Sequence, residues 1–284
     1  MKIKARMIAL DLDGTLLTTE KEFTPYTKEI LRKAIAQGIV VLPATGRPLS
    51  GIPGELLHFP GIRYAITANG GRVVESRTGR TIYEKLVSAP IARKVLEIFE
   101  HYDTLREIYY DGIGYAQEEA LKNVERYIES PPMANYIVTT RRPVPDVRAK
   151  FEAEDRAVDK MQGLFATLED RDAAAEELKS IPGIVVTGAL DKNIEVNAQG
   201  VNKGDALIDL GKRLGIRRED ILAFGDGSND YYMMQKAGTG VAMENGTEEV
   251  KEAADYVARS NDEEGVARFI EEYVCLLYTS DAAD

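Results

Sequence analysis

Two carboxylates lie one residue apart, directly after an apolar run near the start of the chain. Residues 5–13 predict a strand whose apolar run, MIAL at 7–10, is buried and leads into Asp11 and Asp13, with Gly14 and Thr15 giving a turn signal at its end. Because side chains alternate along a strand, both acids share one face if the strand continues through them. Neighbouring acids repel each other, and the loss of water at a sheet end makes their charge more costly. A bound cation relieves both effects, and Mg²⁺ typically combines one or two carboxylates with phosphate oxygens.

The same pair has a simpler interpretation, in which solvated acids at a strand end cap the next element. A calcium-binding EF-hand loop is excluded by spacing, because Gly14 comes two residues too early and no third ligand stands at the fifth position. Whether the acids bind a metal ion or only cap the next element therefore depends on which other residues lie near this strand end.

Other predicted strands end in residues of the same kind. A second apolar strand stops just before Thr45, and a later one stops just before Asp226, with Asn229 and Asp230 in the following turn. Lys203 stands at a predicted helix N-terminus, where backbone amides already favour an anion. Ligands of open α/β sheets bind outside the carboxyl ends of the strands. We therefore expect these residues to meet there.

This inventory suits phosphoryl transfer, which needs charge neutralisation, positioning and an in-line nucleophile. The two histidines, His58 and His101, lie far apart without catalytic-looking neighbours, so a carboxylate nucleophile that forms an aspartyl-phosphate is the consistent choice. Each segment alone is weak evidence for this function. Sequences such as Thr45-Gly46-Arg47 and Asn69-Gly70 commonly form plain turns, and an exposed lysine often precedes a helix. The ordered set carries the prediction.

The pattern of strands and helices changes twice along the chain. Apolar strands alternate with amphipathic helices up to residue 83 and again after about residue 190, which predicts a doubly wound, mostly parallel α/β sheet. Between them lies an α+β pattern rich in hairpins. We expect a discontinuous core domain of residues 1–83 and 191–274 and an inserted domain of residues 84–190. The tail, residues 275–284, fits no element and is left out of the fold.

The individual elements follow from apolar periodicity and from glycine and proline positions. Within the inserted segment we expect helices at 89–101, 118–129 and 171–180, two short strands within 106–117, strands at 161–168 and 183–187, and loops at Pro131-Pro132 and at residues 143–145. A further strand is expected at 193–197, just after the expected boundary.

Composition limits the partners. The formal net charge of −11 and the pI of about 4.9 argue against a nucleic-acid or anionic membrane surface, because the positive footprint is absent. The single cysteine, Cys275, forms no disulfide within the chain, and we see neither a signal peptide nor an apolar run of spanning length. We therefore expect a cytoplasmic monomer or small homo-oligomer that binds a phosphorylated small molecule.

At this point the residues carry a family resemblance. Four segments, Asp11-Leu12-Asp13-Gly14-Thr15, Thr45-Gly46-Arg47, Lys203-Gly204 and Gly225-Asp226-Gly227-Ser228-Asn229-Asp230, resemble the four motifs of the haloacid dehalogenase (HAD) superfamily. The insert between the second and third motifs resembles the C2-type cap of Cof-type sugar-phosphate phosphatases. The likeness extends to about residue 274, and it implies a Rossmann-like HAD core with an inserted α+β cap.

The resemblance implies a role for each motif residue. Asp11 would attack phosphorus, and Asp13 would protonate the leaving oxygen and then activate water. Thr45, Gly46 and Lys203 would hold the phosphate group, and Asn229 would touch the phosphate or brace its loop. Arg47, Asn69 and Gly70 would contact the substrate. The implied Mg²⁺ ligands are Asp11, the Asp13 carbonyl, Asp226 and Asp230.

The expected activity is Mg²⁺-dependent hydrolysis of phosphate monoesters of small metabolites. Two alternatives stay open: a phosphomutase, which the same motifs support, and a non-catalytic phosphometabolite sensor, against which the intact Asp11 and Asp13 weigh. Candidate substrate contacts in the insert are Arg106, Tyr109, Tyr110 and Arg141.

Overall fold

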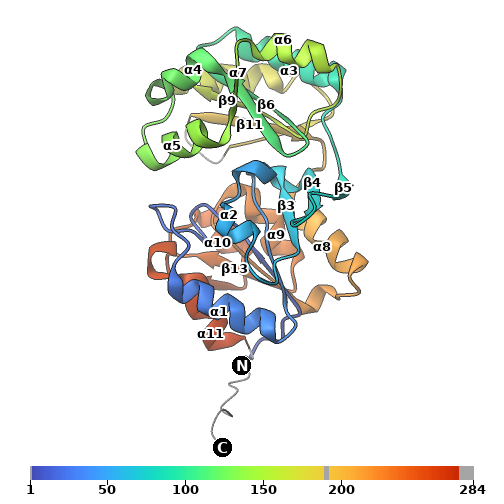
Figure 1. Ribbon diagram of the computed structural model, residues 1–284, viewed down its shortest axis with the longest axis vertical. Helices are drawn as coiled ribbons and strands as arrows, with labels where there is room; N and C mark the ends of the chain where they lie inside the picture. The colour runs from blue at the N-terminus through green and yellow to red at the C-terminus, as the bar shows by residue number, and fades with distance from the viewer. Residues whose placement is uncertain (1, 189–191, 275–284) are drawn as a thin grey trace, which may run out of the picture.

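The computed structural model describes residues 2–188 and 192–274, so the predicted tail at 275–284 lies outside the described residues. Two layered bodies lie one above the other along the long axis of the molecule, and the chain crosses between them twice (Figure 1). Among the described residues, no helix combines the length and the apolar composition needed to cross a membrane.

The core is built on a five-stranded parallel sheet in the order β14-β13-β12-β1-β2. Its strands are apolar runs because a parallel sheet is covered on both faces. All four residues of β1 are buried. The strands are β1 (Met7–Leu10), β2 (Val40–Pro43), β12 (Ile221–Gly225), β13 (Thr239–Met243) and β14 (Tyr256–Ala258).

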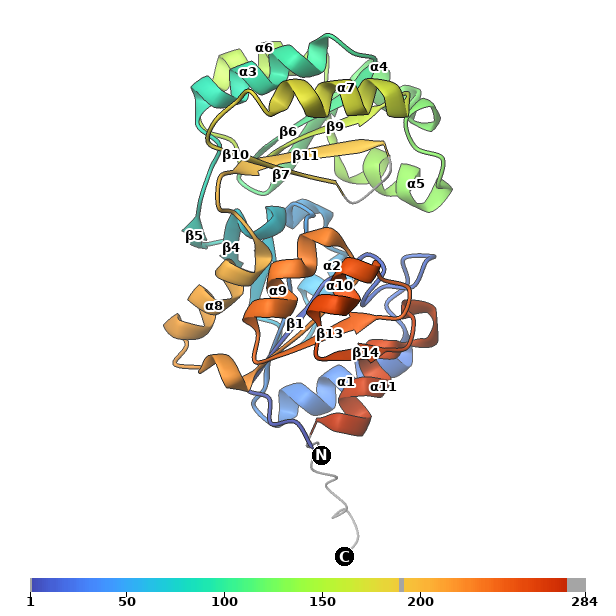
Figure 2. The ribbon, with the colours of Figure 1, turned by 180° about the vertical axis from the view of Figure 1, so that it is seen from behind.

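Helices cover both faces of this sheet (Figure 2). Ile8 and Leu10 of β1 pack with α1 and α11, whereas Met7 and Ala9 point to the opposite face and pack with α8, α9 and α10. Alternation along β1 therefore divides the core into two apolar layers. The helices are α1 (Pro25–Ala36), α2 (Gly54–Leu57), α8 (Lys203–Arg213), α9 (Tyr231–Lys236), α10 (Glu248–Ala253) and α11 (Gly265–Tyr273).

A three-stranded antiparallel sheet extends the core beside β2. Its strands, β3 (Tyr64–Thr67), β4 (Arg72–Glu75) and β5 (Thr81–Glu84), occur where a strand and a hairpin were expected. A bridge between Ala44 and Ile66 ties this sheet to the residue that follows β2. The chain then leaves the core after β5.

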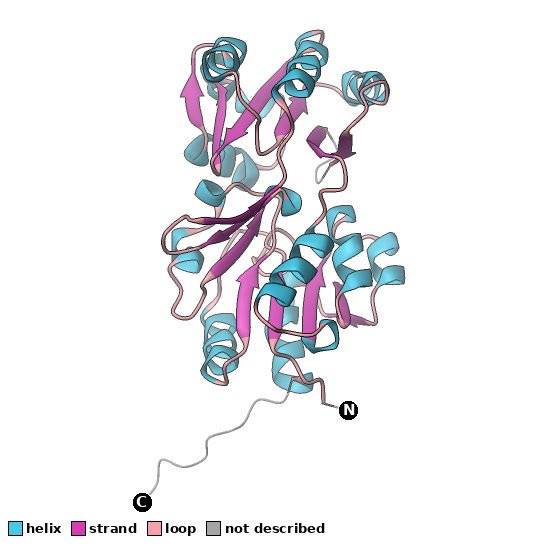
Figure 3. Ribbon diagram, turned by 90° about the vertical axis from the view of Figure 1, so that its right-hand side faces the viewer, coloured by secondary structure: helices cyan, strands magenta, loops and turns pink. Residues whose placement is uncertain are grey.

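The second body is a cap built on a six-stranded sheet in the order β10-β11-β9-β6-β7-β8. One face packs against α3, α6 and α7, which form its outer layer, and the other face is turned toward the core (Figure 3). Part of that inner face is covered by α4 and α5. The strands are β6 (Thr104–Tyr110), β7 (Ile113–Gln117), β8 (Arg142–Val144), β9 (Met161–Phe165), β10 (Ile184–Thr187) and β11 (Asn193–Ala198). The helices are α3 (Ala89–Glu100), α4 (Glu118–Lys122), α5 (Pro131–Thr140), α6 (Val147–Glu154) and α7 (Leu168–Leu178).

Several expectations for the cap are corrected by the structure. The loop expected at Pro131-Pro132 is instead the first turn of α5, where a proline loses no helical hydrogen bond. The helix expected at 118–129 stops at Lys122 and is followed by a short 3₁₀ turn. Pro143 lies in β8, an edge strand, where its missing N–H can be tolerated.

The domain boundaries remain a proposal, which the strand pairing refines. β11 pairs with β9 and β10 in the cap sheet rather than with the core, although the expected boundary at residue 190 assigned it to the core. We propose a cap of residues 85–201, because Val201 is the last residue that packs in the apolar cluster of the cap.

The close approach of α8 to α9 depends on Gly204, and a substitution at this position tests it. A Cβ at this position would lie 2.3 Å from the carbonyl oxygen of Tyr232, a backbone atom that cannot rotate away. We expect Gly204→Ala to lower the free energy of unfolding by about 1–3 kcal/mol through overpacking, measured by urea denaturation. Gly54→Ala, where the nearest atom would be 4.0 Å away, is the matched control. Equal stability of the two variants would show that α8 moves away without cost.

Candidate active site

The carboxyl ends of β1, β2 and β12 open on a small cavity under the cap. It has a volume of about 120 Å³. Because these strands are adjacent and parallel, the residues that follow them gather at one edge. From the core, the cavity is lined by Asp11, Asp13, Thr45, Gly46, Arg47, Asp226, Gly227 and Asn229.

Three carboxylates meet beside this cavity. Asp11, Asp226 and Asp230 can each place an oxygen within 4.8 Å of the others. Burial raises the pKa of Asp11 well above its ordinary value, with a smaller contribution from the two other acids. Burial and the charge of Asp230 raise the pKa of Asp226 to about 7. The neighbouring side chains neutralise only part of the negative charge of these carboxylates. Carboxylate oxygens are hard ligands, so the group fits a divalent cation such as Mg²⁺.

Lys203 is the cation that the protein itself supplies to this cluster. Its Nζ atom lies 2.5 Å from Asp11 Oδ1 and 2.7 Å from Asp230 Oδ1, and the side chain is fully buried. Burial lowers the pKa of Lys203, but the two carboxylates outweigh it and hold that pKa above the ordinary value. The side chain of Asn202 caps α8 by accepting from the Asp205 amide at 2.7 Å. The helix start therefore holds a permanently charged ammonium between two acids.

The loop after β12 is fixed by its own acids. Asp230 Oδ2 accepts hydrogen bonds from the backbone amides of Asp226 and Gly227, both at 3.0 Å. The Thr15 hydroxyl donates to Asp226 Oδ1 at 2.7 Å. A Cβ at Gly14, where φ is +80°, would lie 2.3 Å from Asp226. The glycine therefore lets the first and last motif loops touch.

Asp13 has different partners from Asp11. Arg47 donates to both of its carboxylate oxygens at 2.7 Å, and Lys21 donates at 2.7 Å. Burial raises the pKa of Asp13, but the hydrogen bonds and charges of Arg47 and Lys21 outweigh it and hold that pKa well below its usual range. The ring of Tyr136, from cap helix α5, covers the Arg47 guanidinium at 4.1 Å from its centroid. Two acids two residues apart thus have opposite electrostatic environments.

The other predicted residues divide into those at the cavity and those behind it. Thr45, Gly46, Arg47 and Asn229 line the cavity, whereas neither Asn69 nor Gly70 does. Asn69 Oδ1 accepts from Asn229 Nδ2 at 3.1 Å, and its Nδ2 donates to Glu195 of the cap. A Cβ at Gly70, where φ is +97°, would lie 2.4 Å from the Asn202 carbonyl oxygen. Both residues therefore support the site from behind its wall.

The cap closes the cavity with residues that the sequence analysis largely missed. Arg141 was a candidate and lines it; the others are Met133, Tyr136, Ile137, Lys160, Gln162, Asn193 and Glu195. A usable signal exists in β11, where Asn193, Glu195 and Asn197 occupy alternate positions and are all buried. A strand with a buried polar face indicates a polar cavity or interface.

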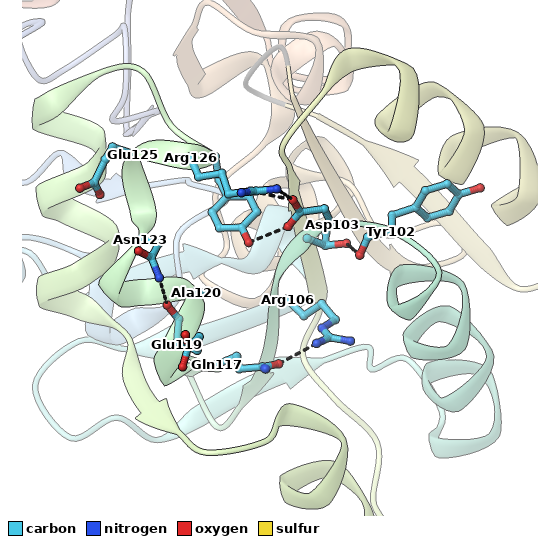
Figure 4. Close-up of a pocket in the computed structure, with 11 residues that line it drawn as sticks. Tyr102, Asp103, Arg106, Gln117, Glu119, Ala120, Asn123, Glu125 and Arg126 are labelled. Atoms are coloured by element: carbon cyan, nitrogen blue, oxygen red, sulfur yellow. Dashed lines mark hydrogen bonds and ion pairs between the residues drawn. The ribbon is translucent and has the colours of Figure 1, made fainter.

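The remaining candidates lie elsewhere. Tyr109 supports Arg141, whose guanidinium lies 5.3 Å from its ring centroid, and Tyr110 packs in the outer cap cluster. Arg106 lines a second hollow of about 560 Å³ on the cap (Figure 4). That hollow shares no lining residue with the cavity at the strand ends. Its Arg106 donates to Gln117 at 2.7 Å and its Arg126 to Asp103 at 2.6 Å. Arg106 Nε is buried there without a hydrogen-bond partner among the described residues. No motif residue lines this hollow, so the smaller cavity is the candidate site.

The comparisons with known proteins agree with this geometry. A family model described as haloacid dehalogenase-like hydrolase matches residues 8–270. The 5-amino-6-(5-phospho-D-ribitylamino)uracil phosphatase YcsE of Bacillus subtilis is 30% identical, over 96% of this chain and 97% of its own. The phosphatase YwpJ of the same organism is 27% identical, over 93% and 98%.

Solved structures give the same answer for the fold. A haloacid dehalogenase-like hydrolase from B. subtilis superimposes with a TM-score of 0.84 at 27% identity, covering 95% of this chain and all of its own. A HAD subclass IIB sugar phosphatase superimposes with a TM-score of 0.79 at 26% identity, covering 94% and 98%. The chain therefore belongs to the haloacid dehalogenase-like hydrolases, with a HAD core and an inserted cap, and it is a phosphoric monoester hydrolase.

Proposed function

We propose that this protein hydrolyses phosphate monoesters of small metabolites, sugar phosphates or related compounds, with Mg²⁺ and through an aspartyl-phosphate on Asp11. The observation that carries the proposal is the group of three carboxylates around Lys203 at the strand ends, under a cap that leaves a cavity of about 120 Å³. Hydrolysis is favoured over a phosphomutase reaction because the curated relatives named above are phosphatases.

The metal would be held by carboxylate oxygens of Asp11 and Asp226 and by the backbone carbonyl of Asp13, with Asp230 in or just behind the coordination sphere. Asp230 is the most withdrawn, because Lys203 and two backbone amides already occupy its oxygens. Bound Mg²⁺ neutralises negative charge on the acids and on the phosphate oxygens, which lets one carboxylate approach phosphorus.

Asp11 is the nucleophile in this proposal. Its carboxylate oxygen bonds to phosphorus while the bond from phosphorus to the leaving oxygen breaks, and Asp13 gives that oxygen its proton. Asp13 then takes a proton from water, which attacks phosphorus and frees Asp11. Lys203 stays protonated throughout because its pKa is raised. Together with Thr45, Gly46 and Asn229 it can bind the phosphate oxygens as their positions change during the reaction.

Arg47 sets a condition on this sequence of steps. As long as it donates to both oxygens of Asp13, that carboxyl holds no proton at neutral pH. A phosphate or leaving-group oxygen is an alternative acceptor for the guanidinium, so substrate binding would release one oxygen of Asp13. Arg47 thus serves as a substrate contact that also controls the acid.

The remaining expectations stay proposals. The absence of a nucleic-acid partner is supported by the net charge of −11, and a cytoplasmic location by the single cysteine. A monomer or small homo-oligomer stays a proposal.

Removal of the metal tests the cofactor. We expect hydrolysis of p-nitrophenyl phosphate, followed as released inorganic phosphate, to stop after exhaustive chelation and to return with Mg²⁺. Ca²⁺ should inhibit, because its longer bonds and higher coordination number spoil the in-line geometry. Activity that survives chelation would remove the metal from the mechanism. With glucose 6-phosphate as the substrate, an isomeric sugar phosphate in place of free phosphate would indicate a mutase.

Replacing Asp11 or Asp13 by asparagine should block different steps of the reaction. Asp11→Asn removes the nucleophile, so no phosphoenzyme forms. Asp13→Asn keeps the backbone carbonyl and removes proton transfer, an effect of roughly a hundredfold to ten-thousandfold. With p-nitrophenyl phosphate, whose leaving group needs no proton, Asp13→Asn should accumulate a phosphoenzyme that mass spectrometry of the quenched protein detects. Phosphate on another residue, or on the Asp11→Asn protein, would contradict the mechanism.

A further inference from the structure

The cap face above the cavity carries two buried ion pairs. Arg141 Nε donates to Glu107 Oε2 at 3.0 Å, and Lys160 Nζ donates to Glu195 Oε1 at 2.5 Å. The side chains are at most 8% exposed. Buried ion pairs pay heavily in lost hydration and are weak evidence for a role in stability. Their position on the wall of the active site favours a role in binding.

Lys160 has a donor left over. An ammonium group has three N–H donors, and Lys160 gives one to Glu195 and one to Gln162 Oε1 at 3.2 Å. The third has no hydrogen-bond acceptor among the residues that the structure describes, although Nζ lies 4.9 Å from the Tyr109 ring centroid. Lys160 is 1% exposed and lines the cavity. An acceptor supplied by a ligand would complete its hydrogen bonding.

The charge of this wall indicates the kind of acceptor. Glu195 already neutralises Lys160, and Glu107 already neutralises Arg141. A second phosphate or a carboxylate on the leaving group would have to compete with these buried acids and would lie close to them. A hydroxyl oxygen accepts a hydrogen bond without adding charge. The wall therefore suits an uncharged, hydroxylated leaving group.

The size of the cavity also favours a small leaving group. Its volume of about 120 Å³ is below the roughly 300–1,000 Å³ of pockets for drug-sized ligands. Met133 and Ile137 of α5 give the wall an apolar side against which a short carbon chain can lie.

We propose that Lys160 is a specificity-determining residue that donates to a hydroxyl of the leaving group, and that the preferred substrates are monophosphates of small, uncharged polyols or sugars. The inference rests on the proposed function and adds the residue and the charge of the leaving group.

Glu195 positions Lys160 in this arrangement. Its Oε2 accepts from Asn69, which in turn accepts from Asn229 of the phosphate-binding loop at 3.1 Å. A continuous polar chain thus runs from Lys160 in the cap through Glu195 and Asn69 to the core. The orientation of the lysine is thereby set relative to the phosphate site.

Matched substrate pairs test the charge rule on the unmodified protein. We expect the kcat/KM of glycerol 3-phosphate to be at least tenfold higher than that of 3-phosphoglycerate. The kcat/KM of glucose 6-phosphate should exceed that of 6-phosphogluconate by a similar factor. In each pair the second compound carries one additional carboxylate. The reverse order, or no difference, would overturn the proposal. If the protein hydrolysed no ester, p-nitrophenyl phosphate included, the proposed function would fail and this inference with it.

Variants test Lys160 itself. We expect Lys160→Met to lower the ratio of kcat/KM for glycerol 3-phosphate to that for p-nitrophenyl phosphate at least tenfold, chiefly through KM, because the aryl group offers no hydroxyl. The double variant Lys160→Met/Glu195→Gln leaves no unpaired buried charge and should show the same loss. Glu195→Gln alone, which keeps an acceptor for the lysine, should retain more of the ratio than Glu195→Ala.

Lys150→Met is the matched control, since Lys150 pairs with Glu154 outside the cavity, and it should leave the ratio unchanged. A double variant with the melting temperature of the unmodified protein and an unchanged ratio would show that Lys160 is only structural. If the variants did not fold, the substrate pairs would still decide the charge rule.

Discussion

The repulsion among three carboxylates around one buried lysine is the constraint on which the rest of the structure depends. Asp11 and Asp226 end two adjacent strands, and their separation is fixed by the hydrogen-bond spacing of the sheet. Asp230 is held by backbone amides of its own loop, so it cannot turn away. Lys203 compensates only part of the charge, and it does so from a helix whose start is packed against the core. The acids are therefore held close together at a charge that a bound cation would relieve, so the site is electrostatically preorganised for a cation.

The cap contributes a second electrostatic layer of a different character. Over the strand ends, charge is left uncompensated; on the cap wall, Arg141 and Lys160 are each matched by a glutamate. In the proposed mechanism, the reacting end of a substrate would meet net charge, and its other end would meet a neutral but strongly polar surface. Several contacts join cap and core, and two of them lie beside motif residues: the Tyr136 ring over Arg47 and the hydrogen bond from Asn69 to Glu195. Each connects a cap residue to a core residue that touches a motif, so the position of the cap bears on both Asp13 and the phosphate loop.

The core was predictable from sequence and the cap wall was not, for a physical reason. Parallel strands buried on both faces must be continuous apolar runs, so β1 and β12 are unambiguous, and the polar residues that follow them, such as Asp11 and Asp226, are located with them. In β11, the alternation of apolar and polar residues equally describes a strand with one solvated face, which hid the burial of Glu195. Lys160 directly precedes β9 and resembles a strand-end lysine until the fold places it beside Glu195, 35 residues away. Asn69 was identified, but its supporting place behind the wall depends on contacts with two other segments that no local pattern encodes.

The second crossing from cap to core has a mechanical consequence. Val201 packs in the apolar cluster of the cap, whereas the next residue, Asn202, caps α8 and lies against Gly70 of the core. The proposed border between cap and core thus falls on a single peptide unit, one residue before Lys203. Asn202, on the core side of this peptide unit, caps α8 through the Asp205 amide, so the lysine that contacts Asp11 is carried by an element anchored in the core.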